Sequence, residues 1–209
     1  MQYFSCLTFN LFELSLISEL IVLILSIFEK NQLMKKINKV RLIVLSALIF
    51  GLAFLNIFFA DMPNFSPIAA IALFSGAFIS NKKLAFLIPI AAIFISDLIV
   101  GLHSLMWAVY LSFVLVVVLG TTIKRVAPLK VVGFSLLGSC LFFAITNFSV
   151  WAQGSFYTHS FSGLMECYYM GLPFFKNTLI GDLSFNVVLF SAFSFAEHRI
   201  PALRLVSSN

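Results

Sequence analysis

The sequence predicts an all-α membrane protein with several crossings. Of its 209 residues, 61% are apolar and only 10% are charged, whereas a soluble domain has about 45–50% apolar and about 25% charged residues. The mean hydropathy is +1.08, and 26 residues are Phe. A water-soluble globule of this length has too little interior to bury so much apolar surface. A disordered chain is also excluded, because disorder requires low hydrophobicity.

Six apolar stretches separated by polar breakers are the predicted membrane-spanning helices, because a helix needs about 20 apolar residues to cross the hydrocarbon core. The stretch at 67–80 is short for a full crossing, so we expect it to be tilted, extended into its flanks or partly non-helical. Together the stretches predict one six-span membrane domain over residues 34–200, followed by a cytoplasmic tail at 201–209. The predicted spans are 41–60, 67–80, 84–101, 104–123, 131–151 and 172–196.

A further apolar stretch, 3–28, precedes the first span and carries Glu13 and Glu19. Carboxylates are costly in lipid unless they are shielded. Residues 1–33 are therefore either a seventh helix or a segment ahead of a true start at Met34, whose charged residues are ordinary before a first span. That start also resembles a secretory signal, but the apolar stretch after it is long and ends in a poor cleavage site, which favours a retained anchor.

Lys and Arg lie in short clusters between alternate spans, and such clusters keep loops on the cytoplasmic side. If the six spans begin inside, 12 of the 13 basic residues are cytoplasmic and only Lys176 is on the outer side. Both ends of the six-span domain then face the cytoplasm. Because the clusters are topology signals rather than one solvated basic face, the net charge of +5 indicates no nucleic-acid partner.

Polar residues gather toward the outer ends of the predicted spans, while the inner halves hold little beyond Ser and Thr. An ion conduit would place polar groups along its whole length, whereas a pocket that opens outward needs them on one side only. Helix capping explains any one of these residues, but two buried carboxylates, Asp97 and Asp182, need partners or a cationic ligand. The predicted ligand-binding residues are Asn64, Asp97, His103, Asn147, Trp151, Tyr168 and Asp182.

The predicted outer loop, 152–171, is longer than a connection requires and is rich in aromatic and polar residues. We expect it to cover the pocket as a lid, with Trp151 and Tyr168 against an apolar face of the ligand. The alternative is an interfacial segment whose aromatic residues form a belt at the membrane surface. The two interpretations are compatible with each other.

Pairs of small residues four apart allow helix backbones to approach closely. Ala47 and Gly51 form such a pair on the first span, and Ala72 and Gly76 form one on the second. These pairs serve either internal packing, which we favour, or the docking of a partner protein. Ala47 and Gly51 are the candidate docking residues.

Catalytic and nucleotide-binding motifs are missing from the sequence. It has no G-x-x-x-x-G-K-[ST] loop, no H-E-x-x-H and no G-x-S-x-G. The three cysteines lack the paired spacing of a disulfide framework or a zinc site. We therefore expect no enzymatic activity, no cofactor and no metal site. A membrane enzyme with Asp97, His103 and Asp182 as acid and base groups is the less favoured alternative.

Five motifs resemble the signature of a bacterial membrane family known only as a domain of unknown function. The resemblance covers roughly residues 38–196, and residues 1–33 lie outside it, which favours Met34 as the start. The motifs are PNFSPIAAIALFSG at 63–76, SDLIVGLH at 96–103, TNFSVW at 146–151, GLMECY at 163–168 and GLPFFKNTLIGD at 171–182.

That family in turn resembles the substrate-capturing S components of energy-coupling-factor (ECF) transporters. These are six-helix proteins that bind a vitamin or metal near the outer surface and dock on a separate ATPase-bearing module. The resemblance implies an S-component-like bundle in the bacterial cytoplasmic (inner) membrane, in contact with lipid. It implies uptake of a vitamin-like or metal-containing small molecule from the extracytoplasmic side, together with a separate transmembrane coupling protein with ATPases.

The substrate itself stays open at this point. One branch of the S components uses a cysteine thiol at the cobalt of cobalamin, and Cys167 is the only cysteine in the predicted outer loop. No motif match carries that role over to it. The main alternative to uptake is a non-catalytic membrane assembly protein that packs through Ala47 and Gly51.

Overall fold

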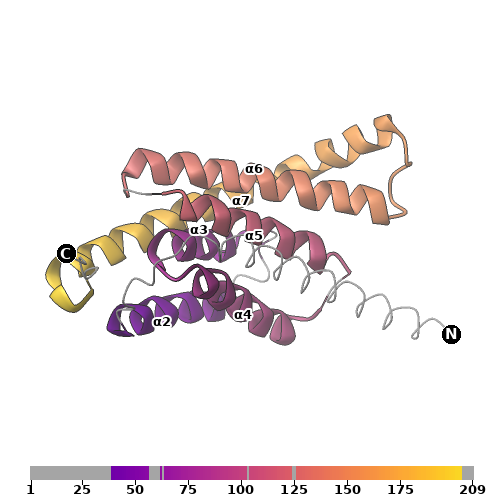
Figure 1. Cartoon of the computed structure of the whole chain (residues 1–209). Helices are drawn as coiled ribbons and strands as arrows, with labels where there is room; N and C mark the ends of the chain where they lie inside the picture. Colours follow the sequence, from indigo (N-terminus) through magenta and orange to yellow (C-terminus); the bar gives the residue numbers. More distant parts are fainter. Residues whose placement is uncertain (1–38, 57–61, 63, 103, 124–125, 204–209) are drawn as a thin grey trace.

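A computed structural model shows an all-helical chain (Figure 1), with six α-helices, one short 3-10 helix and no strand in the part that it describes. The predicted all-α class is therefore confirmed for that part. The predicted extension, 1–33, and the last residues of the predicted tail lie outside it. The described residues are 39–56, 62, 64–102, 104–123 and 126–203.

Each predicted span corresponds to one helix. Only α6 and α7 are long and apolar enough to cross a membrane among the described helices, and α3 has just 11 residues. Six helices are thus confirmed, while six crossings stay a prediction. The helices are α2 (Lys39–Leu55), α3 (Ile68–Phe78), α4 (Lys82–Val100), α5 (Met106–Thr121), α6 (Pro128–Gln153), α7 (Phe161–Arg199) and the 3-10 helix η2 (Pro201–Leu203).

The helix α7 differs most from its prediction, because it begins at Phe161 rather than near residue 172. The side chain of Ser160 caps its first turn by accepting a hydrogen bond from the backbone N–H of Gly163, at 3.2 Å. The turns that follow bury Cys167 and Gly171 against α6, which stabilises the added helix. The prediction of a long outer loop was therefore wrong, and only residues 154–160 connect α6 to α7.

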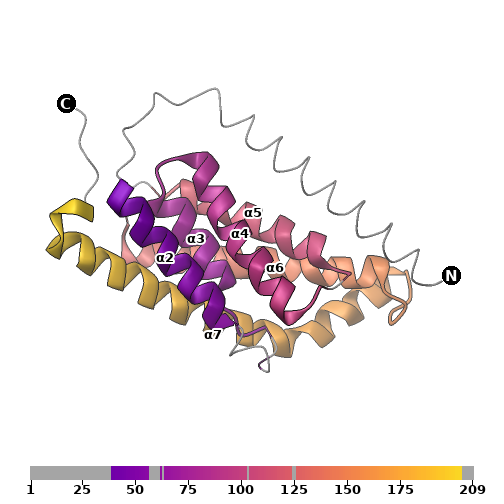
Figure 2. The ribbon, with the colours of Figure 1, turned by 90° about the horizontal axis from the view of Figure 1, so that it is seen from below.

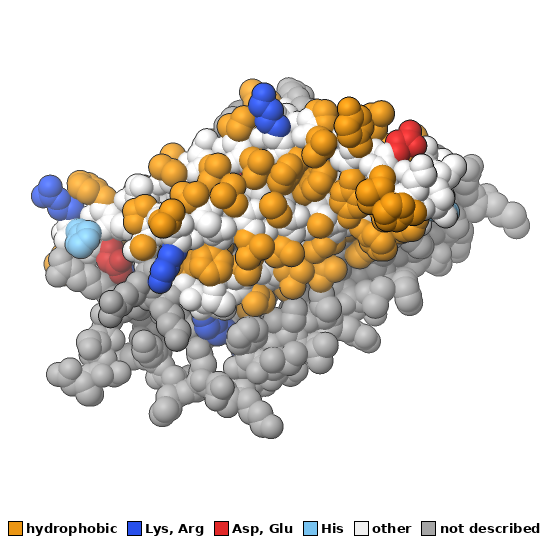
Figure 3. All heavy atoms as spheres, turned by 90° about the horizontal axis from the view of Figure 1, so that it is seen from above, with side chains coloured by type: hydrophobic (Ala, Val, Ile, Leu, Met, Phe, Trp, Pro, Cys, Tyr) orange, Lys and Arg blue, Asp and Glu red, His pale blue; other side chains and the backbone are white. Residues whose placement is uncertain are grey.

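The two longest helices, α6 and α7, form a hairpin that extends past the shorter helices (Figures 1 and 2). Helices α2, α4 and α6 begin at the end of the molecule at which α7 finishes. We call this the basic end, because Lys39, Lys82, Lys130 and Arg199 lie there at helix termini. Hydrophobic side chains cover most of the described surface over α6 and α7, with few charged ones between them (Figure 3).

Helix α3 is the centre of the bundle. Of its 11 residues, all but Ala77 are buried, and it contacts each of the other five α-helices. Its Phe74 packs edge-on against Phe190 of α7, with ring centroids 5.5 Å apart, and Phe78 packs against Phe193, at 4.7 Å. A helix that is apolar on all sides must be surrounded by other helices or by lipid, and here the other helices surround it.

Two glycines let α3 and α5 pack with their backbones in contact. A Cβ atom added at Gly76 would overlap the carbonyl oxygen of Val117 and lie 2.9 Å from the Cα of Gly120. A Cβ atom added at Gly120 would overlap the carbonyl oxygen of Leu73. The small residues of the second predicted span therefore serve internal packing, as expected.

A buried arginine closes the basic end. Arg41 of α2 is only 5% exposed, and it donates hydrogen bonds to the carboxylate of Glu197 on α7 and to the carbonyl oxygen of Leu203 in η2. Its guanidinium also lies over the ring of Phe193, 5.1 Å from the centroid. The start of the predicted tail is thereby held against α2 and α7.

We expect Gly76→Ala and Gly120→Ala each to destabilise the protein by about 1–3 kcal/mol. Backbone atoms of the neighbouring helix occupy the space that the added methyl group needs, so α3 and α5 must move apart. Thermal unfolding of the purified full chain in mild detergent measures this effect. Gly133→Ala on α6 is the matched control, since its added Cβ meets nothing within 4 Å. That control should be neutral or stabilising by about 0.5–1 kcal/mol. Equal stability of all three variants would contradict the close crossing.

Candidate functional site

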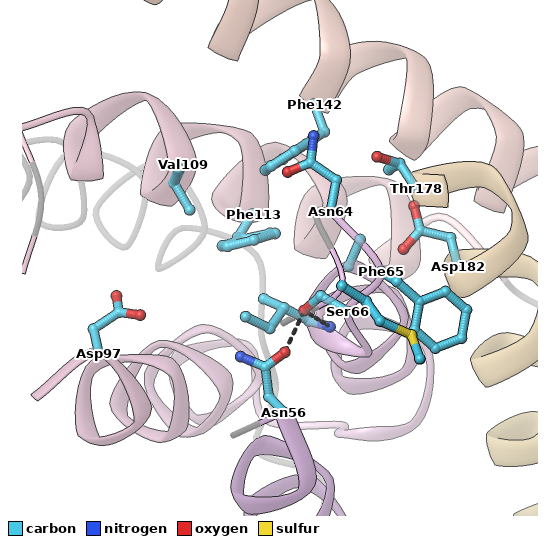
Figure 4. A pocket seen from close by; sticks show the side chains of 13 residues that line it. Asn56, Asn64, Phe65, Ser66, Asp97, Val109, Phe113, Phe142, Thr178 and Asp182 are labelled. Carbon is cyan, nitrogen blue, oxygen red and sulfur yellow. Dashed lines mark hydrogen bonds between the residues drawn. The ribbon is translucent and has the colours of Figure 1, made fainter. Parts of the chain in front are cut away.

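A pocket of about 220 Å³ lies toward the ends of α2 and α4 that are opposite the basic end. Figure 4 shows the side chains that line it. All six helices contribute residues to its wall. These residues come from the end of α2 and its connection to α3, the first turn of α3 and the last turns of α4, and from the first half of α5 and the middle of α6 and α7. Most ligand pockets measure roughly 300–1,000 Å³, so this one suits a small molecule. Residues that are far apart in sequence meet here because the helices alternate in direction.

Three of the predicted ligand-binding residues line this pocket: Asn64, Asp97 and Asp182. They come from three separate elements, namely the connection before α3, the end of α4 and the middle of α7. Asp97 lies on one side of the pocket and Asp182 lies on the other, beside Thr178 (Figure 4). Whether these side chains bind a ligand stays a prediction.

Asp182 is the most deeply buried carboxylate of the pocket, at 3% exposed. The hydroxyl of Ser139 on α6 donates to its Oδ2 atom at 2.6 Å and lies 3.0 Å from the carbonyl oxygen of Ser135. One turn along α7, Asn186 donates to the hydroxyl of Ser135 at 2.9 Å. These pairs form a polar seam between α6 and α7 that leads inward from the pocket.

The sequence did contain a signal for this seam. Ser135 and Ser139 are four residues apart, as are Asp182 and Asn186, and residues at that spacing lie on one face of a helix. Ser and Thr within the predicted spans were not counted among the candidate site residues, so this pairing was not predicted. Only the juxtaposition of α6 and α7 shows that the two faces meet.

Asp97 is half-buried near the end of α4. The hydroxyl of Tyr110, on α5, donates to its Oδ2 atom at 2.7 Å. Tyr110 is itself buried, so this contact fixes the position of the carboxylate on the pocket wall. Tyr110 was not predicted as a site residue, because its position on α5 carries no recognisable spacing to Asp97.

The connection between α2 and α3 shapes the mouth of the pocket. The hydroxyl of Ser66 donates to the side-chain oxygen of Asn56 at 2.7 Å, and the backbone N–H of Ile68 donates back to that hydroxyl at 3.3 Å. Asn64 is exposed and has a positive φ of 59°, a conformation that Asn adopts more readily than most residues. Its predicted place at the rim agrees with this position.

Aromatic rings supply the apolar part of the wall. Phe113 of α5 and Phe142 of α6 lie nearly parallel, with ring centroids 5.6 Å apart and an interplanar angle of 19°. Both rings line the pocket, as does Val109 one turn before Phe113. The wall thus offers a flat apolar surface between the two carboxylates (Figure 4).

The structure places Asn147, Trp151 and Tyr168 in the hairpin of α6 and α7 rather than in the pocket wall. Asn147 donates to the carbonyl oxygen of Phe143 at 2.9 Å. Trp151 donates to the carbonyl oxygen of Thr158 at 3.0 Å. Tyr168 donates to a backbone carbonyl of α6 at 2.7 Å. Their polar groups therefore bind backbone within the hairpin. The last predicted site residue, His103, lies outside the described residues.

No group of three or more His, Cys, Asp and Glu side chains comes together in the described part of the chain. What the pocket does present is two carboxylates, neutral hydrogen-bonding groups and a pair of stacked rings. This combination is suited to holding a small organic molecule by hydrogen bonds and apolar contact.

Comparison with known proteins agrees with part of the resemblance drawn from the sequence. A model for a family of unknown function (DUF6580) matches residues 36–203, a range that contains every residue of the pocket. The chain matches no curated protein and no solved structure. The resemblance to a family of unknown function is thus confirmed, while the likeness to ECF S components stays a prediction.

Proposed function

We propose that this chain, which belongs to the DUF6580 family of unknown function, captures a small molecule from the extracytoplasmic side of a bacterial cytoplasmic membrane for uptake. The observation that carries the proposal is the convergence of Asn64, Asp97 and Asp182 on one pocket opposite the basic end. Because basic ends of membrane proteins face the cytoplasm, a pocket at the other end is accessible from outside.

The proposal places all six helices in the membrane. Large apolar side chains are exposed on α2, α4, α6 and α7, and a soluble protein rarely exposes so much contiguous apolar surface. Helix α3, about 16 Å long at 1.5 Å per residue, is too short to cross a bilayer alone. It lies among the other helices, which shield its ends from lipid, so it fits an S-component-like bundle.

Uptake needs a source of energy, and the sequence has no ATPase motif. We therefore propose docking on a separate transmembrane coupling protein with ATPases, through the face of α2 that contains Ala47 and Gly51. Both residues are exposed, and a Cβ atom added at Gly51 would meet nothing within 4 Å. Ile43 and Phe54 extend the same exposed face. A membrane-embedded helix of the partner could approach closely there.

The same open face of α2 also favours the second candidate function, a non-catalytic membrane assembly protein. In that case complex formation would be the whole function, and the pocket residues would tolerate substitution. No comparable observation favours a membrane enzyme, since Asp97 and Asp182 lie on opposite sides of the pocket.

We expect the full chain, purified in mild detergent, to carry a small molecule that mass spectrometry identifies. Asp97→Asn should carry about one-tenth of that amount or less. Losing a ligand contact worth about 1.4 kcal/mol of binding free energy already weakens the affinity tenfold. Glu166→Gln is the matched control, since it removes one carboxylate that is exposed on α7 outside the pocket. Wild-type protein without any bound molecule would contradict the proposed function, and so would equal amounts of bound molecule in the wild type and Asp97→Asn.

The outward opening of the pocket predicts a specific labelling pattern. Met62→Cys, at a pocket position that is 56% exposed, should react with a membrane-impermeant maleimide on intact cells. Ile200→Cys, at the basic end and 48% exposed, should react only after the cells are permeabilised. Both variants are made with the native cysteines replaced by serine. The reverse pattern would place the pocket in the cytoplasm.

Docking through α2 predicts that Gly51→Leu abolishes co-purification of the coupling protein, because the bulky side chain keeps the partner helix at a distance. Gly133→Leu is the control, as Gly133 is also an exposed helical glycine with open space around it. The bound small molecule should persist in both variants. Unchanged complex formation by Gly51→Leu would exclude this face as the docking surface.

A further inference from the structure

We infer that the molecule held in the pocket is a small organic cation, whose charged group lies against Asp182. This inference rests on the proposed function, that the pocket binds a small molecule, and names the chemical class of that molecule. Three features of the pocket carry it: the sign of its charge, the burial of Asp182 and the stacked rings between the carboxylates.

The charged side chains in the described pocket wall are all acidic. Asp97 and Asp182 face the pocket from opposite sides, and none of the described residues that line it is Lys, Arg or His. Charges act more strongly in apolar surroundings than in water, because the effective dielectric constant there is lower. Both carboxylates therefore attract a cation placed between them and repel an anion.

Asp182 needs a positively charged partner more than Asp97 does. Its carboxylate points into the pocket (Figure 4) and is 3% exposed. Its hydrogen-bond partner among the described residues is the hydroxyl of Ser139, at 2.6 Å, which orients the carboxylate but adds no compensating charge. An ionised carboxylate removed from water is costly unless it takes up a proton or a positive charge lies beside it. A cationic ligand supplies that charge.

The surroundings of the carboxylates indicate an organic cation rather than a metal ion. Phe113 and Phe142 stack in the wall between them, and aromatic faces attract organic ammonium groups and pack against flat apolar ligands. A divalent metal ion is held by several oxygen ligands that converge on one point, whereas Asp97 and Asp182 lie on opposite sides of the pocket (Figure 4). The volume of about 220 Å³ limits the cation to a small one.

Equilibrium dialysis of the full chain in mild detergent tests the inference with three probes that share a phenyl ring and differ in charge: benzyltrimethylammonium, benzyl alcohol and benzenesulfonate. Bound molecule from purification is removed beforehand by extensive washing. We expect benzyltrimethylammonium to bind at least about tenfold more tightly than the neutral alcohol, and benzenesulfonate not to bind. Asp182→Asn should weaken binding of the cation by about tenfold or more, and Glu166→Gln should leave it unchanged.

The probe series keeps the test decisive if Asp182→Asn does not fold, because the order of the three probes is measured on the wild type. Asp97→Asn, at a half-buried position, then serves as the second variant, and we expect weaker cation binding there too. Equal or tighter binding of benzyl alcohol or benzenesulfonate, or no binding of benzyltrimethylammonium, would overturn the inference.

Failure of this inference and failure of the proposed function have different signatures. If mass spectrometry finds a neutral or anionic molecule bound to the purified protein, the proposed function stands and the inference that the ligand is a cation is wrong. If no molecule is bound and none of the probes binds, the proposed function fails as well.

Discussion

The contact between the backbones of α3 and α5 at Gly76 and Gly120 determines how the rest of the bundle is arranged. Both glycines lie near the ends of their helices at the basic end, where no side chain separates the two backbones. Toward their other ends the helices carry full side chains, and the pocket lies there, with Ile68 and Ala69 of α3 on one side and Phe113 of α5 on the other. Close packing at one end thus leaves room for a cavity at the opposite end.

Buried charge is handled differently at the two ends. At the basic end the guanidinium of Arg41 has the carboxylate of Glu197, a backbone carbonyl and aromatic faces around it. These contacts offset the free-energy cost of burying the charge of the guanidinium within the protein. In the pocket, the carboxylate of Asp182 has a neutral hydroxyl as its partner in the described structure. The first charge is already paired within the protein, whereas the ionised form of Asp182 would be stabilised by a positive charge from a ligand, which is the physical basis for assigning binding to that end.

The hairpin of α6 and α7 serves the pocket indirectly. Its inner part presents Phe142, Thr178 and Asp182 to the cavity, and its outer part extends past the shorter helices (Figure 1). Hydrogen bonds from the side chains of Trp151 and Tyr168 to backbone carbonyls stabilise the outer part. Of the aromatic residues that suggested a lid, Tyr168 thus joins the two helices, and Trp151 holds the connection between them against the end of α6.

The sequence by itself determined the helical class, the positions of the six helices apart from the first turns of α7, and the gathering of Asn64, Asp97 and Asp182 toward one end. Apolar length and the placement of Lys and Arg are local properties of the chain. Only the tertiary structure decided which polar residues share a cavity. Asn147 lies in the last two turns of α6, and Asp97 lies in the last turn of α4, yet Asn147 binds backbone inside the hairpin. Ser139 and Tyr110, which hold the two carboxylates, have no distinguishing sequence pattern, since their roles arise from contacts with other helices. Contacts between helices depend on how the helices pack against one another, and the spacing of residues along a single helix does not contain that information.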